Sequence, residues 1–198
     1  MESFPERIEV AVYVAAFMPR PRTPPVLLLQ EFFRESKLEA SMNKQYTVDH
    51  NHDWGQRDDY MTDKLHQNCS PEVLELAKKL PTPARMFLME DLANESLLTE
   101  ERFGSVERVF VMCGEDKANE VEFQRRMMDR SPPKAVKLIG EADHMAVLSN
   151  PMSFVNASRR LLRMTVEKQS IVRSELVQFA FHAINNLPQY CYYNNSVN

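Results

Sequence analysis

Glycine is scarce in this sequence, and the scarcity limits the kinds of catalytic turn that the chain can form. Four glycines occur among 198 residues: Gly55, Gly104, Gly114 and Gly140. A serine nucleophile on a sharp strand-to-helix turn is typically found as G-x-S-x-G, because the turn leaves little room for neighbouring side chains. No serine lies between two glycines at that spacing; Gly104-Ser105 comes nearest, but Phe103 precedes it and Val106 follows it. The sequence therefore contains no nucleophile turn of this kind.

The sequence also has few cysteines, no excess of positive charge and no long apolar run. The three cysteines, Cys69, Cys113 and Cys191, are odd in number and widely spaced, which favours reduced thiols in a cytoplasmic protein over a disulfide framework. A net charge of −4 gives no reason to expect a nucleic-acid partner, which needs a clustered basic face. No apolar run approaches the length of a membrane span, and residues 1–10 lack the pattern of a secretory signal. We therefore expect a cytoplasmic location and no membrane partner.

Two short apolar runs and an intervening amphipathic segment predict a βαβ unit. Residues 106–113 and 135–139 have the composition of buried strands, and residues 121–130 between them have helical spacing. Strand, helix and strand in this order form parallel strands with a right-handed crossover. Residues 8–18 are nearly all apolar and rich in β-branched side chains, which predicts a further strand buried on both faces. The prediction is a single α/β domain with at least three parallel strands.

A polar loop follows each strand of the βαβ unit, and the two loops contain candidate catalytic residues. The first includes Asp116, and the second includes Asp143 and His144. In a parallel sheet both loops emerge at the carboxyl ends of the strands, where open α/β folds place their chemistry. The Asp116 carboxylate can then accept the Nδ1–H of His144 and leave Nε2 free to accept a proton. Asp143 is the competing carboxylate, but we expect it to point elsewhere because it is adjacent in sequence.

The segment between the first two strands, residues 26–91, has the pattern of a helical excursion. Residues 26–41 have helical spacing, and Ser70-Pro71-Glu72 is a helix start signal, with Ser70 as N-cap. A further helix, outside this segment, is predicted from Pro151 to about residue 168, with a buried stripe on one side; the predicted members of the stripe are Phe154, Val155, Ser158, Leu161, Leu162 and Thr165. Residues 49–53, DHNHD, contain potential metal ligands. No matching cluster occurs elsewhere, so a solvated loop is the favoured interpretation.

Several separate stretches resemble the plant methylesterase and hydroxynitrile lyase family of α/β-hydrolases, of the salicylic-acid-binding methylesterase type. They occur in the family's order and extend from about residue 1 to about residue 168. The stretches are AVYVAAFMP (11–19), NCSPEVLELA (68–77), FLMEDL (87–92), RFGSVERVFVMCGEDK (102–117) and GEADHM (140–145). The resemblance implies the carboxyl-terminal part of an α/β-hydrolase fold over residues 1–168, with a cap insertion at about 22–91. Residues 169–198 are then an extension outside the family, for which partial disorder is one expectation.

The resemblance also implies roles for individual residues. Asp116 and His144 match the Asp and His of the family's Ser-Asp-His triad, while the nucleophilic serine and the oxyanion hole have no counterpart here. Phe17 and Met145 are implied to contact the substrate. Lyases of the family typically have lysine after the histidine, so Met145 favours an esterase over a hydroxynitrile lyase. The implied substrates are small methyl esters of the methyl salicylate, methyl jasmonate or methyl indole-3-acetate class, and no cofactor or metal is implied.

Three interpretations stay open at the level of sequence. The chain is part of a working methylesterase, a degenerate relative that binds a small aromatic acid without catalysis, or a half-protein that a partner chain completes. The lone polypeptide is expected to be inactive without its nucleophile, because triad residues act as a unit. The first interpretation is favoured because both surviving triad loops look intact. Whether the protein forms a homodimer is left open.

Overall fold

Three parallel strands form the sheet: β1 (Val10–Val14), β2 (Glu107–Cys113) and β3 (Ala135–Ile139). They lie in the order β1-β2-β3, with Val10 opposite Glu107 and Val109 opposite Ala135. The computed structural model describes residues 1–36, 59–80 and 91–166, with side chains to residue 161. The loop at 49–53 and the extension at 169–198 lie outside the described residues. The predicted α/β architecture with parallel strands is confirmed.

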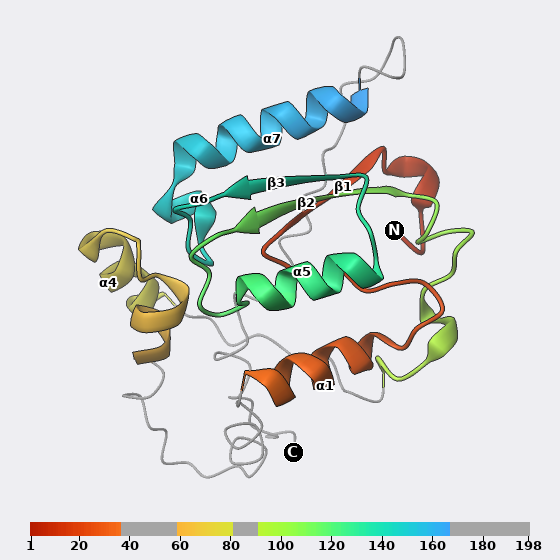
Figure 1. Ribbon diagram of the computed structural model, residues 1–198, viewed down its shortest axis with the longest axis horizontal. Helices are drawn as coiled ribbons and strands as arrows, with labels where there is room; N and C mark the ends of the chain where they lie inside the picture. Colours follow the sequence, from red (N-terminus) through yellow and green to blue (C-terminus); the bar gives the residue numbers. More distant parts are fainter. Residues whose placement is uncertain (37–58, 81–90, 167–198) are drawn as a thin grey trace, which may run out of the picture.

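The sheet is covered on its two faces by different helices. Helix α5 (Val121–Arg130) lies on one face and α7 (Pro151–Val166) on the other (Figure 1). Because successive strand residues point to opposite faces, each strand contributes to two cores. One core joins the sheet to α7 and includes Val12, Val111, Phe154 and Leu161. The other joins it to α5 and includes Tyr13, Phe110, Met112 and Met127.

Strand β1 is shorter than its apolar sequence predicts. Residues Pro5–Arg7 form a 3₁₀ turn before it, and Ala15 after it adopts a φ of 46°. This left-handed conformation is incompatible with an extended strand and is costly for a residue with a Cβ atom. The backbone N–H of Ala15 still donates to the carbonyl oxygen of Val111 at 3.0 Å. The strand thus ends at a strained backbone position that stays attached to β2.

Helix α1 (Pro25–Glu35) packs on α5 through aromatic side chains. The ring centroid of Phe32 lies 4.9 Å from that of Phe17 and 5.4 Å from that of Phe123, in edge-to-face arrangements. Such arrangements are favoured by the aromatic quadrupole. Ion pairs between Arg126 and Glu35 and between Arg130 and Glu31 join the exposed sides of the two helices.

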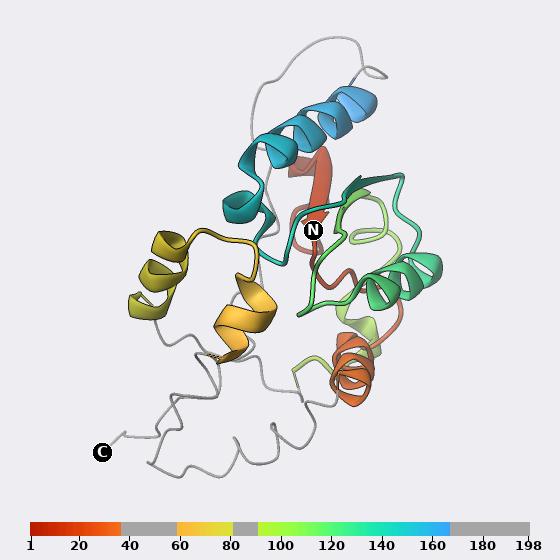
Figure 2. The same cartoon turned by 60° about the vertical axis from the view of Figure 1, so that its left-hand side comes forward.

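The other helices and helical turns are short. They are a π-helical turn η2 (Met61–Leu65), helix α4 (Pro71–Lys79), a 3₁₀ turn η3 (Glu95–Leu97) and α6 (Ala146–Ser149). Ser70 caps α4 as predicted, since its Oγ accepts the N–H of Val73 at 3.4 Å. The apolar side of α4 has no fully buried residue, and Leu76 and Leu80 are 56% and 65% exposed. Turned by 60°, the molecule shows η2 and α4 beside the sheet and separate from α1 (Figure 2).

Helix α7 begins at Pro151 as predicted, but one predicted core residue is wrong. Val155 is 44% exposed, whereas Phe154, Ala157, Ser158 and Leu161 are buried. Spacings of three and four residues follow one side of a helix, so Ala157 occupies the stripe from which Val155 is excluded. Among the described residues, no helix is long and apolar enough to cross a membrane.

Candidate active site

The loops that follow β2 and β3 are joined through their backbones. The N–H of Gly114 donates to the carbonyl oxygen of Ile139 at 2.9 Å, and that of Glu115 donates to the carbonyl oxygen of Ala142 at 3.0 Å. The two loops approach so closely that a Cβ atom on Gly114 would lie 2.4 Å from the carbonyl oxygen of Gly140. Glycine is therefore required at position 114, because any side chain would force the loops apart.

This approach brings Asp116 and His144 into contact. The Oδ2 atom of Asp116 lies 2.9 Å from Nδ1 of His144, and both side chains are buried. A proton on Nδ1 makes this contact a hydrogen bond and leaves Nε2 as the proton acceptor of the ring. The sequence prediction that these two residues are adjacent is confirmed.

The Asp116 carboxylate is held by its own loop. Its Oδ1 atom accepts the backbone N–H groups of Ala118 at 2.9 Å and Asn119 at 2.8 Å. Hydrogen bonds of this kind stabilise the ionised form of a carboxylate. Burial raises the pKa of the nearby Tyr60 hydroxyl, and the Asp116 charge raises it further. The geometry thus provides a buried, hydrogen-bonded carboxyl group beside the imidazole.

Two buried amide side chains that the sequence analysis missed support this loop. Nε2 of Gln124 donates to the carbonyl oxygen of Asn119 at 2.6 Å and to Asp116 Oδ2 at 3.4 Å, while its Oε1 accepts the N–H of Cys113 at 3.3 Å. The side chain of Asn119 donates to the carbonyl oxygen of Ala15 at 3.0 Å. Gln124 could have been found as a polar residue within the apolar stripe of its helix, since buried polar groups need partners.

Asp143 points away from the imidazole of His144, as predicted. Its Oδ2 atom accepts the backbone N–H of Asn68 at 2.9 Å, and Sγ of Cys69 lies 3.8 Å from the same oxygen. Burial raises the pKa of Cys69 to about 12, and the charge of Asp143 contributes to the rise. Burial likewise raises the pKa of Cys113. Both thiols stay protonated at neutral pH and are poor nucleophiles.

The two predicted substrate contacts lie in different surroundings. The ring of Phe17 packs against Phe32 and Phe123 in the aromatic cluster between α1 and α5. Met145 follows His144 and is partly exposed, and its N–H donates to Asp143 Oδ1 at 2.9 Å. Their roles toward a substrate stay predictions.

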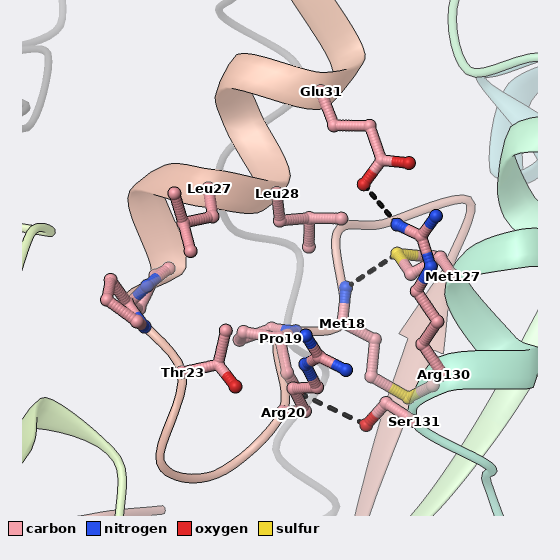
Figure 3. A pocket seen from close by; sticks show the side chains of 12 residues that line it. Met18, Pro19, Arg20, Thr23, Leu27, Leu28, Glu31, Met127, Arg130 and Ser131 are labelled. Atoms are coloured by element: carbon pink, nitrogen blue, oxygen red, sulfur yellow. Dashed lines mark hydrogen bonds and ion pairs between the residues drawn. The ribbon is translucent and has the colours of Figure 1, made fainter. Parts of the chain in front are cut away.

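A shallow pocket lies at the carboxyl-terminal end of α5, where it meets the start of α1. Leu28, Met127 and Ser131 are among the residues that line it, and Arg130 pairs with Glu31 at its side (Figure 3). Neither Asp116 nor His144 lines it. Within the described residues, no three His, Cys, Asp or Glu side chains are grouped as metal ligands would be.

Comparisons with known proteins identify relatives of this chain. No protein-family model matches the chain. Polyneuridine aldehyde esterase of Rauvolfia serpentina is 36% identical over 161 residues, which cover 76% of this chain and 59% of the relative. Salicylic acid-binding protein 2 of Nicotiana tabacum is 37% identical over 162 residues, covering 76% and 60%. Methyl jasmonate esterase 1 of Vitis vinifera is 36% identical over 159 residues, covering 77% and 60%.

The fold agrees with these relatives. The crystal structure of polyneuridine aldehyde esterase superposes with a TM-score of 0.65 at 33% identity, covering 85% of this chain and 65% of that one. The described residues form part of an α/β-hydrolase fold. The chain spans about three fifths of the length of the curated relatives that it matches.

Proposed function

The chain is a relative of the plant methylesterases, and from this premise we propose that it supplies the acid–base part of a carboxylic ester hydrolase site. The observation that supports the proposal best is the buried Asp116–His144 pair at 2.9 Å. The proposed substrates are small hormone methyl esters, of the methyl salicylate, methyl jasmonate or methyl indole-3-acetate class. The names of two relatives, methyl jasmonate esterase 1 and salicylic acid-binding protein 2, support the jasmonate and salicylate classes.

In the proposed reaction, Nε2 of His144 accepts the proton of a serine hydroxyl as its oxygen attacks the ester carbonyl carbon. The bond to the methoxy oxygen then breaks, and the same proton passes from His144 to methanol. Water, deprotonated by His144, next attacks the acyl carbon. The bond to the serine oxygen then breaks, and His144 returns the proton to that oxygen, which releases the acid and the serine. Asp116 keeps Nδ1 protonated and stabilises the imidazolium in both steps. No G-x-S-x-G sequence occurs among the 198 residues, so the serine is proposed to come from polypeptide outside this sequence.

The alternative is a relative that binds a small aromatic acid without catalysis. The buried, hydrogen-bonded Asp116–His144 pair favours hydrolysis over this alternative. The two functions differ in one respect that can be measured, which is the dependence of methyl ester turnover on His144.

The test begins with the native protein purified from its source, whose intact mass is compared with the 23.1 kDa of this chain. A heavier species that contains a G-x-S-x-G segment should hydrolyse the methyl esters. His144→Ala in that species should lower kcat by roughly 10⁴-fold or more. The control is Asp129→Asn, an exposed site on α5. A native mass of 23.1 kDa, with acid binding and no turnover, would establish the non-catalytic alternative.

A further inference from the structure

The segment at residues 67–69 contacts both loops of the Asp116–His144 pair. It lies between η2 and α4, far in sequence from either loop. Its attachment to the loop after β3 runs through Asp143, which is 0% exposed. Asp143 accepts the backbone N–H of Asn68 with Oδ2 and that of Met145 with Oδ1, each at 2.9 Å. One carboxylate thus joins this segment to the residue that follows His144.

The same segment is attached to the loop after β2. Nδ2 of Asn68 donates to Oε2 of Glu115 at 2.7 Å, and it also donates to the carbonyl oxygen of Glu141, in the loop after β3, at 3.2 Å. Nε2 of Gln67 donates to the carbonyl oxygen of Glu115. Each loop of the pair is therefore held from outside as well as by its neighbour, and Asn68 takes part in both attachments.

We propose that residues 67–69 act as a clamp on the two loops, with Asp143 as a positioning residue for His144. The neighbouring side chains of Asp143 and His144 have different partners: Asp143 bonds to Asn68 of the clamp, and His144 bonds to Asp116. With Asp143 fixed on both of its oxygens, the backbone that carries His144 cannot rotate freely. Hydrogen bonds that fix the residue beside a catalytic group determine how precisely that group is placed. The significance for catalysis rests on the proposed function of His144, whereas the geometric claim does not.

Asp143→Asn in the 198-residue chain tests the clamp. An asparagine amide offers one acceptor oxygen and one NH₂ group, so a donor would face the N–H of Asn68 or that of Met145. We measure, by NMR, the solvent exchange of the His144 Nδ1–H proton that bonds to Asp116, with His144→Gln to assign the signal. Exchange should accelerate by about tenfold or more, while backbone amides of β2 keep their protection.

Two further variants grade the effect. Asn68→Ala removes the contacts to Glu115 and Glu141 but keeps its backbone N–H to Asp143, so exchange should accelerate by a smaller factor. Asp129→Asn makes the same change of charge on an exposed part of α5 and should have no effect. If Asp143→Asn does not fold, Asn68→Ala decides alone.

The proposal is overturned if Nδ1–H exchange in the folded variants equals that of the unmodified chain. It is also overturned if β2 amides lose protection in parallel, since Asp143 would then stabilise the fold in general. The readout does not involve ester turnover. A native protein that fails to hydrolyse methyl esters would therefore count against the proposed function and leave the clamp intact.

Discussion

The two loops of the candidate site contain similar buried carboxylates that are held in different ways. In the loop after β2, Asp116 accepts N–H groups from Ala118 and Asn119, two and three residues further along the same loop. In the loop after β3, Asp143 accepts one local N–H group, from Met145, and a second one from Asn68, 75 residues away in sequence. The first loop is thus largely a local structure, whereas the second takes its shape from a distant segment.

This difference separates the two requirements of an acid–base pair. The carboxylate must stay fixed, and a local turn with backbone donors can hold it without help from distant segments. The imidazole ring must have a fixed orientation, and this orientation depends on how the rest of the molecule packs around the loop. We therefore expect perturbation of the β2 loop to damage the fold, and perturbation of the β3 loop to damage the alignment of His144 first.

The largest effect is expected from Gly114→Ala, which forces the two loops apart. The added Cβ atom would meet backbone atoms of Gly140, the nearest at 2.4 Å, and backbone cannot move aside as a side chain can. Overpacking of this kind costs about 2–3 kcal/mol of unfolding free energy, measured by urea denaturation. The matched control is Gly140→Ala, whose Cβ atom would meet nothing within 4 Å, so its cost should stay within about 0.5 kcal/mol. Equal costs for the two variants would contradict the close approach of the loops.

A smaller effect is expected from Gln124→Leu, which keeps the size of the side chain and removes its polar contacts. The N–H of Cys113 and the carbonyl oxygen of Asn119 would lose their amide partners inside the protein. Leaving buried groups unsatisfied costs about 1–3 kcal/mol, again measured in urea. Arg125→Leu on the exposed side of the same helix should change stability by no more than about 0.5 kcal/mol. An unchanged Gln124→Leu variant would show that the β2 loop does not need its amide support.

The local structures of the site could be predicted from sequence, and the long-range ones could not. The bounds of β3 and α5 agree with the predicted ranges, because apolar runs and helical spacing are local signals. The adjacency of Asp116 and His144 followed from the topology of a βαβ unit. The contacts of Asn68 and Asn119 have no comparable signal, since their partners, the Asp143 carboxylate and the carbonyl oxygen of Ala15, belong to residues far away in sequence. Nor could the apolar sequence of β1 indicate that Ala15 would turn to a left-handed φ.

The smallest effect is expected from His66, which precedes the clamp in sequence. The pH dependence of stability tests whether this segment is buried against the loop after β3. The ring of His66 is buried, with Nδ1 3.3 Å from the carbonyl oxygen of Met61. Burial lowers its pKa; the bond to Met61 and the charge of Asp143 oppose the shift, while His144 adds to it. The unfolded chain, with an ordinary histidine pKa of about 6.5, therefore binds a proton at a pH where the folded chain does not. The contribution of His66 to stability is therefore complete above the pKa of the unfolded chain, and it is lost as the pH falls through the lower pKa of the folded chain.

The corresponding variant is His66→Gln, whose amide can still donate to Met61 but does not titrate. The unmodified chain should lose more unfolding free energy than this variant when urea titrations at pH 7.5 and pH 5.5 are compared. The difference should be smaller than either effect above, because the substitution keeps a hydrogen bond to Met61 and removes only the titration of the ring. The same pH loss in both proteins would mean that protonation of His66 is no harder in the folded chain. In that case the segment that leads into the clamp would be open to water, and the contrast between the two loops would be weaker than the contacts of Asp143 indicate.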